Sequence, residues 1–372
     1  MKNNKKLIPE LRFPEFENEG EWEIKTLSGI CDITNGKANA QDHVDNGRYP
    51  LFDRSEVIKA SDEFIFDCEA VIIPGEGMRF IPKYYEGKFN LHQRAYALKD
   101  FSCSGQFVYY SMLHRSTLLS QKAVQSTVLS LRLPILQDFP IEIPKKPEEQ
   151  QKIASCLSSL DEVISAHSQK LDLLKDHKKG LMQNLFPQQG EKEPKYRFPE
   201  FTKDGNWGVK SFEQLFTIGN GRDYKHLDSG DIPVYGSGGY MLSVNDYLYD
   251  GESVCIGRKG TIDKPMFLSG KFWTVDTLFY THSFKKCLPM YIFYVFENID
   301  WRNHNEAGGV PSLSKTNIYK IEILVPPTIQ EQKKIASCLT ALDKLINAQT
   351  EKIEQLKLHK KGLMQGLFPK NY

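Results

Sequence analysis

The sequence predicts an α+β fold of mixed α/β character, in which two pseudo-repeated α/β domains are joined by two long helices that form an antiparallel coiled coil. Three observations predict it. A 39-residue segment at 149–187 recurs at 331–369 with 25 identical residues. Both copies carry apolar residues at a strict 4-3 spacing, which is the pattern of a coiled coil. The region before each copy alternates short β-like runs with Gly and Pro turns, which is typical of a mixed α/β domain.

The repeat extends outside these segments. Arg12–Phe16 recurs as Arg197–Phe201, and Trp22 recurs as Trp207. A long internal repeat indicates one structural unit used twice. The predicted order is a first variable domain at 1–145, a central helix at 146–187, a second variable domain at 188–325 and a C-terminal helix at 326–372. Because the sequences of the two variable domains are identical only at scattered positions, we expect the domains to recognise different targets.

The first helix has its predicted seam at Ile153, Leu157, Leu160, Ile164, His167, Leu171, Leu174, Lys178 and Leu181. The second has Ile335, Leu339, Leu342, Ile346, Gln349, Ile353, Leu356, Lys360 and Leu363. His167 and Gln349 are the fifth of nine layers in each seam. In a symmetric antiparallel register they would face each other, and a central polar pair can fix register. Alternatively, His167 merely tolerates a partly exposed seam.

The ends of the helices carry further signals. Lys178 and Lys360, in the eighth layer, are expected to reach water near the helix ends. Thr328 with Glu331 has the pattern of a capping box, and Pro147 is a favourable first residue for the central helix. Each seam spans about 42 Å at 1.5 Å per residue, somewhat more than the roughly 34 Å of one turn of B-DNA. The helices could therefore hold two DNA-reading domains about a turn apart, or they could simply join two domains.

The variable domains show short predicted strands and helices. The strands include 71–73, 141–143, 253–256 and 321–325, and the helices include 106–119 and 289–299. The Gly-rich segment 235–240 lacks the pattern of a nucleotide-binding loop and is interpreted as a turn.

Polar and basic residues gather at the predicted turns. Arg and Lys on Gly-supported loops suit phosphate or guanine, and Asn suits adenine. The candidates for DNA binding are Lys37, Asn39, Arg79, Lys83, Arg94, Arg222, Tyr224, Lys225, Arg258, Lys259, Thr261 and Lys264. Arg258 and Lys259 are the strongest, because flanking glycines let the backbone approach a ligand closely. For each residue, the alternative is an ordinary solvated loop.

Composition limits the class of protein. The 372 residues carry a net charge of +1, so DNA binding would have to come from local clusters or from a partner. No apolar run approaches the ~20 residues of a membrane span, and the N-terminus lacks the apolar core of a secretory signal. Seven scattered cysteines predict a reducing cytoplasm and neither a disulfide framework nor a zinc site. No catalytic or metal-binding motif is present.

The order of motifs closely resembles the specificity subunit of Type I restriction–modification systems. The resemblance rests on EQxKIASCLxxLDxxI and KKGLMQxLFP after each variable domain, and on Gly257–Pro265 followed by Phe272–Asp276. It covers essentially the whole chain. It implies two target-recognition domains, at 1–145 and 188–325, that each read half of a bipartite, asymmetric DNA site. One departure is that Pro74–Met78 occupies the place of Gly257–Thr261, with less basic charge.

The resemblance also implies partners. The two helices would space the domains and dock two methyltransferase (modification) subunits, and restriction–translocase subunits would complete the complex for defence against foreign DNA. The chain itself would be non-catalytic and bind no cofactor, since S-adenosylmethionine, ATP and Mg²⁺ would be used by the partners. The identical helix ends provide the docking candidates His177, Lys178, Lys179, His359, Lys360 and Lys361, which could also be solvated helix ends.

Two other functions remain open at this point. An enzyme with a site scattered over loops would need a deep pocket with perturbed titratable groups. A non-DNA-binding coiled-coil interaction scaffold would lack a basic recognition surface.

Overall fold

The computed structural model describes residues 7–125, 128–188 and 190–370, so the N-terminal residues 1–6 lie outside it. By contacts the chain forms two compact units. The first unit is Met1–Ser168 with Glu351–Tyr372, and the second unit is Gln169–Thr350. Each unit therefore holds one variable domain and parts of both long helices, whereas the predicted four-segment division follows the sequence and is not tested by this partition.

A six-stranded sheet forms the centre of the first unit. Its strand order is β2 (Asp32–Asn35), β7 (Ala95–Lys99), β5 (Phe66–Pro74), β6 (Lys83–Leu91), β3 (Tyr49–Phe52) and β4 (Lys59–Ser61). All neighbours are antiparallel except β3 and β6. A separate pair joins β1 (Glu23–Thr26) to β8 (Pro140–Ile143). The helices are α1 (Gly105–His114), α2 (Ser116–Lys122) and α3 (Leu133–Gln137), with short 3-10 turns at Pro14–Phe16, Leu27–Gly29 and Ala40–Asp42.

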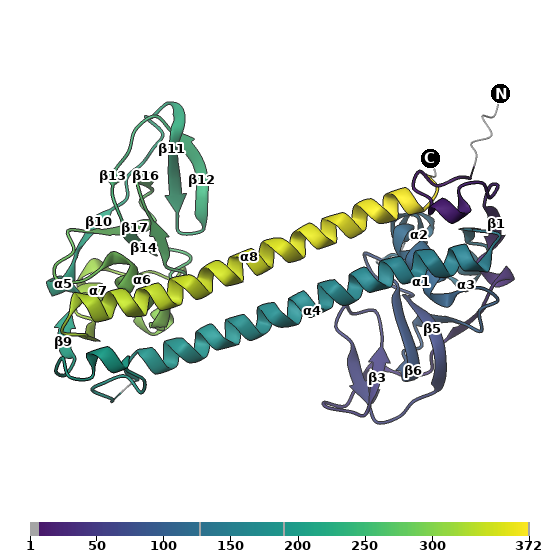
Figure 1. Cartoon of the computed structure of the whole chain (residues 1–372), viewed down its shortest axis with the longest axis horizontal. Helices are drawn as coiled ribbons and strands as arrows, with labels where there is room; N and C mark the ends of the chain where they lie inside the picture. Colours follow the sequence, from purple (N-terminus) through teal and green to yellow (C-terminus); the bar gives the residue numbers. More distant parts are fainter. Residues whose placement is uncertain (1–6, 126–127, 189, 371–372) are drawn as a thin grey trace. The chain divides into compact units, whose positions relative to one another are not determined.

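The second unit divides the corresponding strands between two sheets. One has the order β10 (Thr217–Asn220), β17 (Leu278–His282), β14 (Ser253–Gly257) and β15 (Met266–Leu268). The other has the order β12 (Gly239–Val244), β11 (Ser229–Gly236), β16 (Lys271–Thr274) and β13 (Tyr249–Asp250), and its β11–β12 hairpin projects away from α6 (Figure 1). β9 (Gly208–Ser211) pairs with β18 (Glu322–Val325). The helical elements are α5 (Phe212–Leu215), α6 (Pro289–Asn298) and α7 (Lys315–Tyr319), with 3-10 turns at Pro199–Phe201 and Trp301–His304.

The two long helices are α4 (Pro147–Leu185) and α8 (Ile329–Leu367). In the first unit the start of α4 and the end of α8 share one core, which contains Leu157 and Leu367. In the second unit the end of α4, including Leu185, shares a core with the start of α8, including Leu339. All predicted seam positions are buried or half-buried. The mixed α/β fold and the antiparallel helix pairing are therefore confirmed.

Most predicted elements of the variable domains are present, with one difference. The predicted helix 106–119 is interrupted at Arg115, so it forms α1 and α2. Arg115 is buried, where it donates to the carbonyl oxygen of Pro140 at 2.7 Å and pairs with Glu142. The long-range pairing of this side chain explains a break that local helix propensity does not signal. The predicted Gly-rich turn joins β11 to β12, with Gly239 at φ 112°.

A buried ion pair attaches the repeated Arg-Phe-Pro-Glu-Phe motif to the start of each long helix. In the first unit Arg12 donates to both carboxylate oxygens of Glu149 at 2.8 Å, and the Trp22 indole donates to Glu149 at 3.2 Å. The Arg12 and Glu149 side chains are only 7% and 1% exposed. Two parallel hydrogen bonds to one carboxylate fix both distance and orientation. The motif therefore sets where the variable domain meets its helix.

The second unit repeats this arrangement. Arg197 donates to Glu331 at 2.8 and 2.9 Å, and the Trp207 indole donates to Glu331 at 3.1 Å. The Glu331 backbone N–H donates to the Thr328 hydroxyl at 3.3 Å, as a capping box requires. The reciprocal half of the expected box is replaced, because the Glu331 carboxylate accepts from Arg197 and Trp207.

The predicted central layer remains untested by these contacts. Gln349 is buried and His167 is half-buried. The two residues belong to different compact units. Their role in fixing register stays a prediction.

Candidate nucleic-acid interface

Two loops of the first variable domain meet at one turn. The turn joins β6 to β7, and its carbonyl groups accept from the loops that follow β2 and β5. Gly36 N–H donates to Ala95 O at 3.3 Å, and Gly75 N–H donates to Arg94 O at 2.9 Å. A Cβ at Gly36 would overlap the carbonyl group of Leu91, so only glycine fits this close approach. The backbone therefore fixes the loops without using their side chains.

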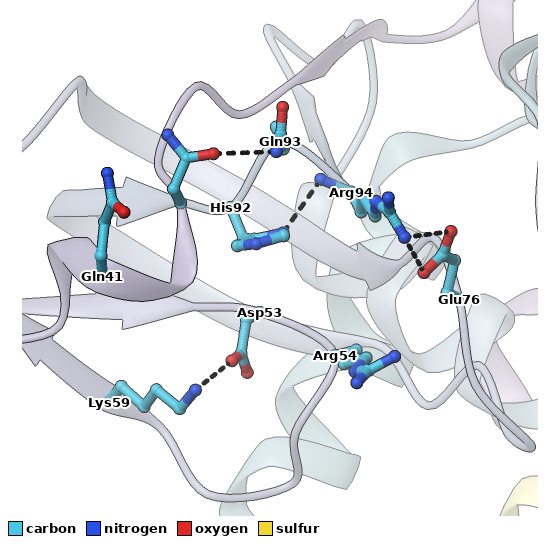
Figure 2. Close-up of a pocket in the computed structure, with 9 residues that line it drawn as sticks. Gln41, Asp53, Arg54, Lys59, Glu76, His92, Gln93 and Arg94 are labelled. Atoms are coloured by element: carbon cyan, nitrogen blue, oxygen red, sulfur yellow. Dashed lines mark hydrogen bonds and ion pairs between the residues drawn. The ribbon is translucent and has the colours of Figure 1, made fainter.

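These loops and the β3–β4 loop enclose a polar groove of about 560 Å³ (Figure 2). It is lined by Asn39, Gln41, Asp53, Arg54, Lys59, Glu76, His92, Gln93 and Arg94. We call this set the first groove. Its polar side chains offer both hydrogen-bond donors and acceptors, which suits the edge of a base pair.

Several side chains in the first groove are held in place. Gln93 Nε2 donates to Asn39 Oδ1 at 2.8 Å, and Arg94 Nη1 donates to the two Glu76 oxygens at 3.1 and 2.9 Å (Figure 2). Lys59 and Asp53 are paired at 2.7 Å. Burial raises the pKa of Asp53, but hydrogen bonds from Lys59 and Ser55 and the positive charge of Lys59 outweigh burial, so the pKa lies below its ordinary value. Asp53 is therefore a carboxylate at neutral pH.

A second groove of about 450 Å³ shares Arg54 with the first. Two of the predicted residues line it, Arg79 and Lys83. Arg79 is exposed, whereas Lys83 is half-buried and donates to the carbonyl oxygen of Ser55 at 2.5 Å. Burial lowers the pKa of Lys83. The structure thus gives the Lys83 ammonium a role in holding the β3–β4 loop, while Arg79 remains accessible.

The second variable domain uses the same backbone frame with other side chains. Arg222 N–H donates to Thr274 O at 2.8 Å, and Arg258 N–H donates to Thr277 O at 2.8 Å. The loops that carry both arginines therefore meet at the turn between β16 and β17. Glu76 in the first domain forms a backbone bridge with Ser130, and Lys259 forms the corresponding bridge with Ser312. A negative charge in one domain thus takes the place of a positive charge in the other.

The remaining candidates lie around these loops. Lys37 is exposed after β2 but is not among the residues that line the two grooves. Tyr224 is half-buried against the small core around Val234 and Trp273. The structure leaves Lys225, Lys259 and Lys264 exposed and Thr261 half-buried. Arg258 is also exposed, and its Nη1 donates to the Asp276 carbonyl oxygen at 3.4 Å.

Contrary to the prediction, the side chains of the two seam lysines are largely shielded from water. Lys360 donates to the two oxygens of Asp161 at 2.5 and 2.6 Å, and Tyr110 donates to the same carboxylate at 2.7 Å. Its side chain is 13% exposed. The prediction that Lys360 reaches water was wrong. It was based only on the position of Lys360 near the helix end, and it did not consider the contact with Asp161 of α4, which Tyr110 of α1 also binds.

Lys178 occupies the equivalent place in the second unit. It pairs with Asp343 at 2.7 Å and with Glu297 at 2.8 Å, and Tyr294 donates to Asp343 at 2.7 Å. Burial lowers the pKa of Lys178, but hydrogen bonds to both carboxylates outweigh it and raise the pKa overall. Both seam lysines therefore hold the helices together. The other docking candidates are exposed, namely His177, Lys179, His359 and Lys361.

Sequence reasoning missed several residues of the first groove. His92, Gln93 and Arg54 line it but were not predicted. The sequence did contain a pattern that indicates two of them, because His92–Arg94 is a polar triplet between the buried ends of β6 and β7. Its position at a turn could have predicted His92 and Gln93 as binding residues together with Arg94.

A family model described as the Type I restriction modification DNA specificity domain matches residues 19–176 and again 204–358. The two matches span most of the chain, and each covers most of one variable domain and most of its helix. The chain belongs to the family of Type I restriction–modification specificity subunits. It has two DNA specificity domains and is the DNA-recognition component of such a system.

Curated relatives agree with this membership. The chain is 24% identical to the putative type I restriction enzyme MjaX specificity subunit of Methanocaldococcus jannaschii, over 93% of this chain and 92% of the relative. It is 21% identical to the MjaVIII specificity subunit of the same organism, over 96% and 93%. The EcoDI specificity subunit of Escherichia coli is 27% identical over 41% of this chain, and the match spans about a third of that protein, 34%.

Solved structures share the fold. The S subunit of the Type I restriction–modification system from M. genitalium matches with a TM-score of 0.75 and 16% identity, over 98% of this chain and all of the other. A chain from a structure on complex assembly and conformational transition of the type I R-M system has a TM-score of 0.55 and 11% identity, over 94% and 98%. At these identities the likeness shows the fold alone.

Two other features are absent from the part of the chain that the structure describes. None of its helices is long and apolar enough to cross a membrane. No group of three or more His, Cys, Asp or Glu side chains there could hold a metal ion.

Proposed function

We propose that each variable domain of this specificity subunit reads one half of a bipartite, asymmetric DNA site. The observation that carries the proposal is the shared backbone frame of the two domains, in which different side chains occupy equivalent places. Glu76 in one domain corresponds to Lys259 in the other. Two copies of one frame with different hydrogen-bonding groups suit two different half-sites.

The helices would space the two domains and dock two methyltransferase subunits. The repeated helix ends support this role, because two equivalent surfaces suit two copies of one partner. In each, a histidine and a lysine are exposed, His177 with Lys179 and His359 with Lys361. Restriction–translocase subunits would complete the complex.

Chemistry would then belong to the partners. They would use S-adenosylmethionine for methyl transfer and ATP with Mg²⁺ for translocation and cleavage, while this chain would bind double-stranded DNA in the cytoplasm without catalysis. The strongly raised pKa values of Tyr110 and Tyr294 do not mark a catalytic site. Both shifts arise first from burial. Hydrogen bonds to Asp161 and Asp343 raise the pKa values further, and the hydrogen bond between Tyr294 and Thr340 acts in the opposite direction. These perturbed groups therefore have a structural explanation.

The test is co-expression with a modification subunit, followed by mapping of methylated bases across the host genome. We expect a bipartite methylated motif that disappears when this chain is omitted. The Arg258→Ala/Lys259→Ala variant should reduce methylation, whereas Lys203→Ala, at another exposed lysine of the second unit, should not. A soluble complex that adds no methylation would favour the non-DNA-binding scaffold instead.

A further inference from the structure

The first groove contains two side-chain pairs whose unused hydrogen-bonding groups match the edges of two base pairs. Because the groove belongs to one variable domain, an inference about it rests on the proposed function. It concerns which residues determine specificity within that function.

The Arg94 guanidinium is oriented by Glu76. Both contacts use Nη1, at 3.1 and 2.9 Å, and within the described residues the guanidinium makes no other side-chain hydrogen bond. An arginine has five N–H donors in a planar fork. The Nε and Nη2 edge of Arg94 therefore keeps two parallel donors, the arrangement that binds O6 and N7 of guanine.

The charge of this pair favours a base over a phosphate. Arg94 is 63% exposed, whereas Glu76 is 20% exposed, so the carboxylate lies beneath an accessible guanidinium. Glu76 offsets the positive charge of Arg94, and Lys59 is likewise paired with Asp53 in the same groove. The Glu76 carboxylate therefore weakens the attraction of the Arg94 guanidinium for a phosphate group. A carboxylate oxygen can also accept from N4 of cytosine, so Arg94 with Glu76 can recognise both members of a G·C pair.

The second pair matches adenine. Asn39 Oδ1 accepts from Gln93 Nε2 at 2.8 Å. This bond leaves the Asn39 amide with its NH₂ donor and the Gln93 amide with its carbonyl acceptor. Adenine presents the complementary pair in the major groove, an acceptor at N7 and a donor at N6. Arg94 follows Gln93 directly in the chain, so the two pairs are adjacent.

We propose that the first groove is a base-reading site, in which Arg94, positioned by Glu76, contacts a guanine and the Asn39–Gln93 amide pair contacts a neighbouring adenine. The second variable domain has Asp276 and Thr277 where the first has Gln93 and Arg94. That domain therefore reads its half-site with other groups.

The experiment compares methylated motifs from the complete chain co-expressed with a modification subunit. Arg94→Lys should keep the overall motif but lose discrimination at one G·C position of one half-site, by roughly 5- to 150-fold. Glu76→Gln should weaken discrimination at that same position. Asn39→Ala and Gln93→Ala should each act at an adjacent A·T position, and the other half-site should remain unchanged throughout.

Arg48→Ala is the matched control, because Arg48 is an exposed arginine of the same domain, 73% accessible and paired with Asp62 outside the groove. Its motif should equal that of the wild type. If Arg94→Ala and Arg94→Lys also give the wild-type motif, the inference is overturned while the proposed function stands. If the wild-type chain gives no motif, both fail.

Loss of all methylation by the Arg94 variants is resolved by binding of the intact complex to duplexes with single base-pair changes. Loss of preference at one position supports base reading. A uniform loss of affinity across all duplexes would identify Arg94 as a phosphate contact and overturn the inference.

Discussion

Removing the Glu331 carboxylate should strongly destabilise the second unit. Glu331 is 1% exposed and accepts two hydrogen bonds from Arg197 and one from Trp207. Glu331→Ala leaves a guanidinium that is only 9% exposed without its carboxylate, and an indole N–H without an acceptor. Breaking a buried pair in this way costs about 3–5 kcal/mol.

Two further variants separate the contributions of charge and shape. Glu331→Gln keeps an acceptor of similar shape for Trp207 but removes the charge, so we expect a loss of about 1.5–3 kcal/mol. Replacing both partners, as Arg197→Met with Glu331→Leu, leaves no buried charge. That double variant should recover most of the stability lost in Glu331→Ala, because apolar replacement of a buried pair is often close to neutral.

The assay is urea unfolding of the complete chain followed by tryptophan fluorescence. Lys334→Ala is the matched control, since Lys334 pairs with Glu200 at 3.0 Å but both side chains are about half exposed. Its cost should be about 0–1 kcal/mol. If Glu331→Ala costs no more than this control, the reasoning about the buried pair is refuted. Glu149→Ala should reproduce the effect in the first unit.

Three other perturbations test further contacts. Burial, and then Arg115, lower the pKa of His114, so its contribution to stability is present above pH 6.5 and is lost as the pH falls through the lower folded value. Between pH 7.5 and pH 5.5 the wild type should therefore lose more unfolding free energy than His114→Phe, and equal losses would exclude this role. A Cβ at Gly221 would overlap the Val275 carbonyl, so Gly221→Ala should lower the unfolding free energy by about 1–3 kcal/mol. Gly238→Ala, where no atom lies within 4 Å, should change it by no more than about 0.5 kcal/mol in the same urea series, and similar values for the two would contradict the overlap. Lys178→Met should lower the unfolding free energy by about 1–3 kcal/mol, which lies between the values for exposed and buried ion pairs. The measurement is the melting temperature. If Lys178→Met lowers it no more than a variant of an exposed lysine does, the two ion pairs of Lys178 do not stabilise the fold.

The long helices were predictable because their signal is local. The 4-3 spacing and the repeated text define a seam, and all of its positions are buried or half-buried. The contacts of Lys178 were not predictable in the same way. Its partner Glu297 is 119 residues away, and no periodicity links them. Glu331 shows the same limit, because its backbone N–H is capped by Thr328 as predicted, but its carboxylate is taken by Arg197 from a distant part of the chain.

The candidate site was predictable in part. Loop position and residue type marked Asn39 and Arg94, which both line the first groove. The same reasoning included Lys83, whose ammonium is instead used by the backbone of Ser55. It missed Gln93, whose significance depends on its contact with Asn39. Sequence can indicate which loops carry hydrogen-bonding groups, but the three-dimensional fold decides which of those groups remain available to a ligand.

The division of the chain into compact units has a consequence for its synthesis. The second unit is one continuous stretch, Gln169–Thr350, so all of its residues have been made before residue 351 is added. The first unit also includes residues that follow Thr350, and its core contains Met364, Leu367 and Phe368. Translation usually lets the domain nearest the N-terminus fold first. Here the two units are completed in the opposite order, because the core of the unit that the ribosome begins first contains Met364, Leu367 and Phe368, which are made after the whole second unit.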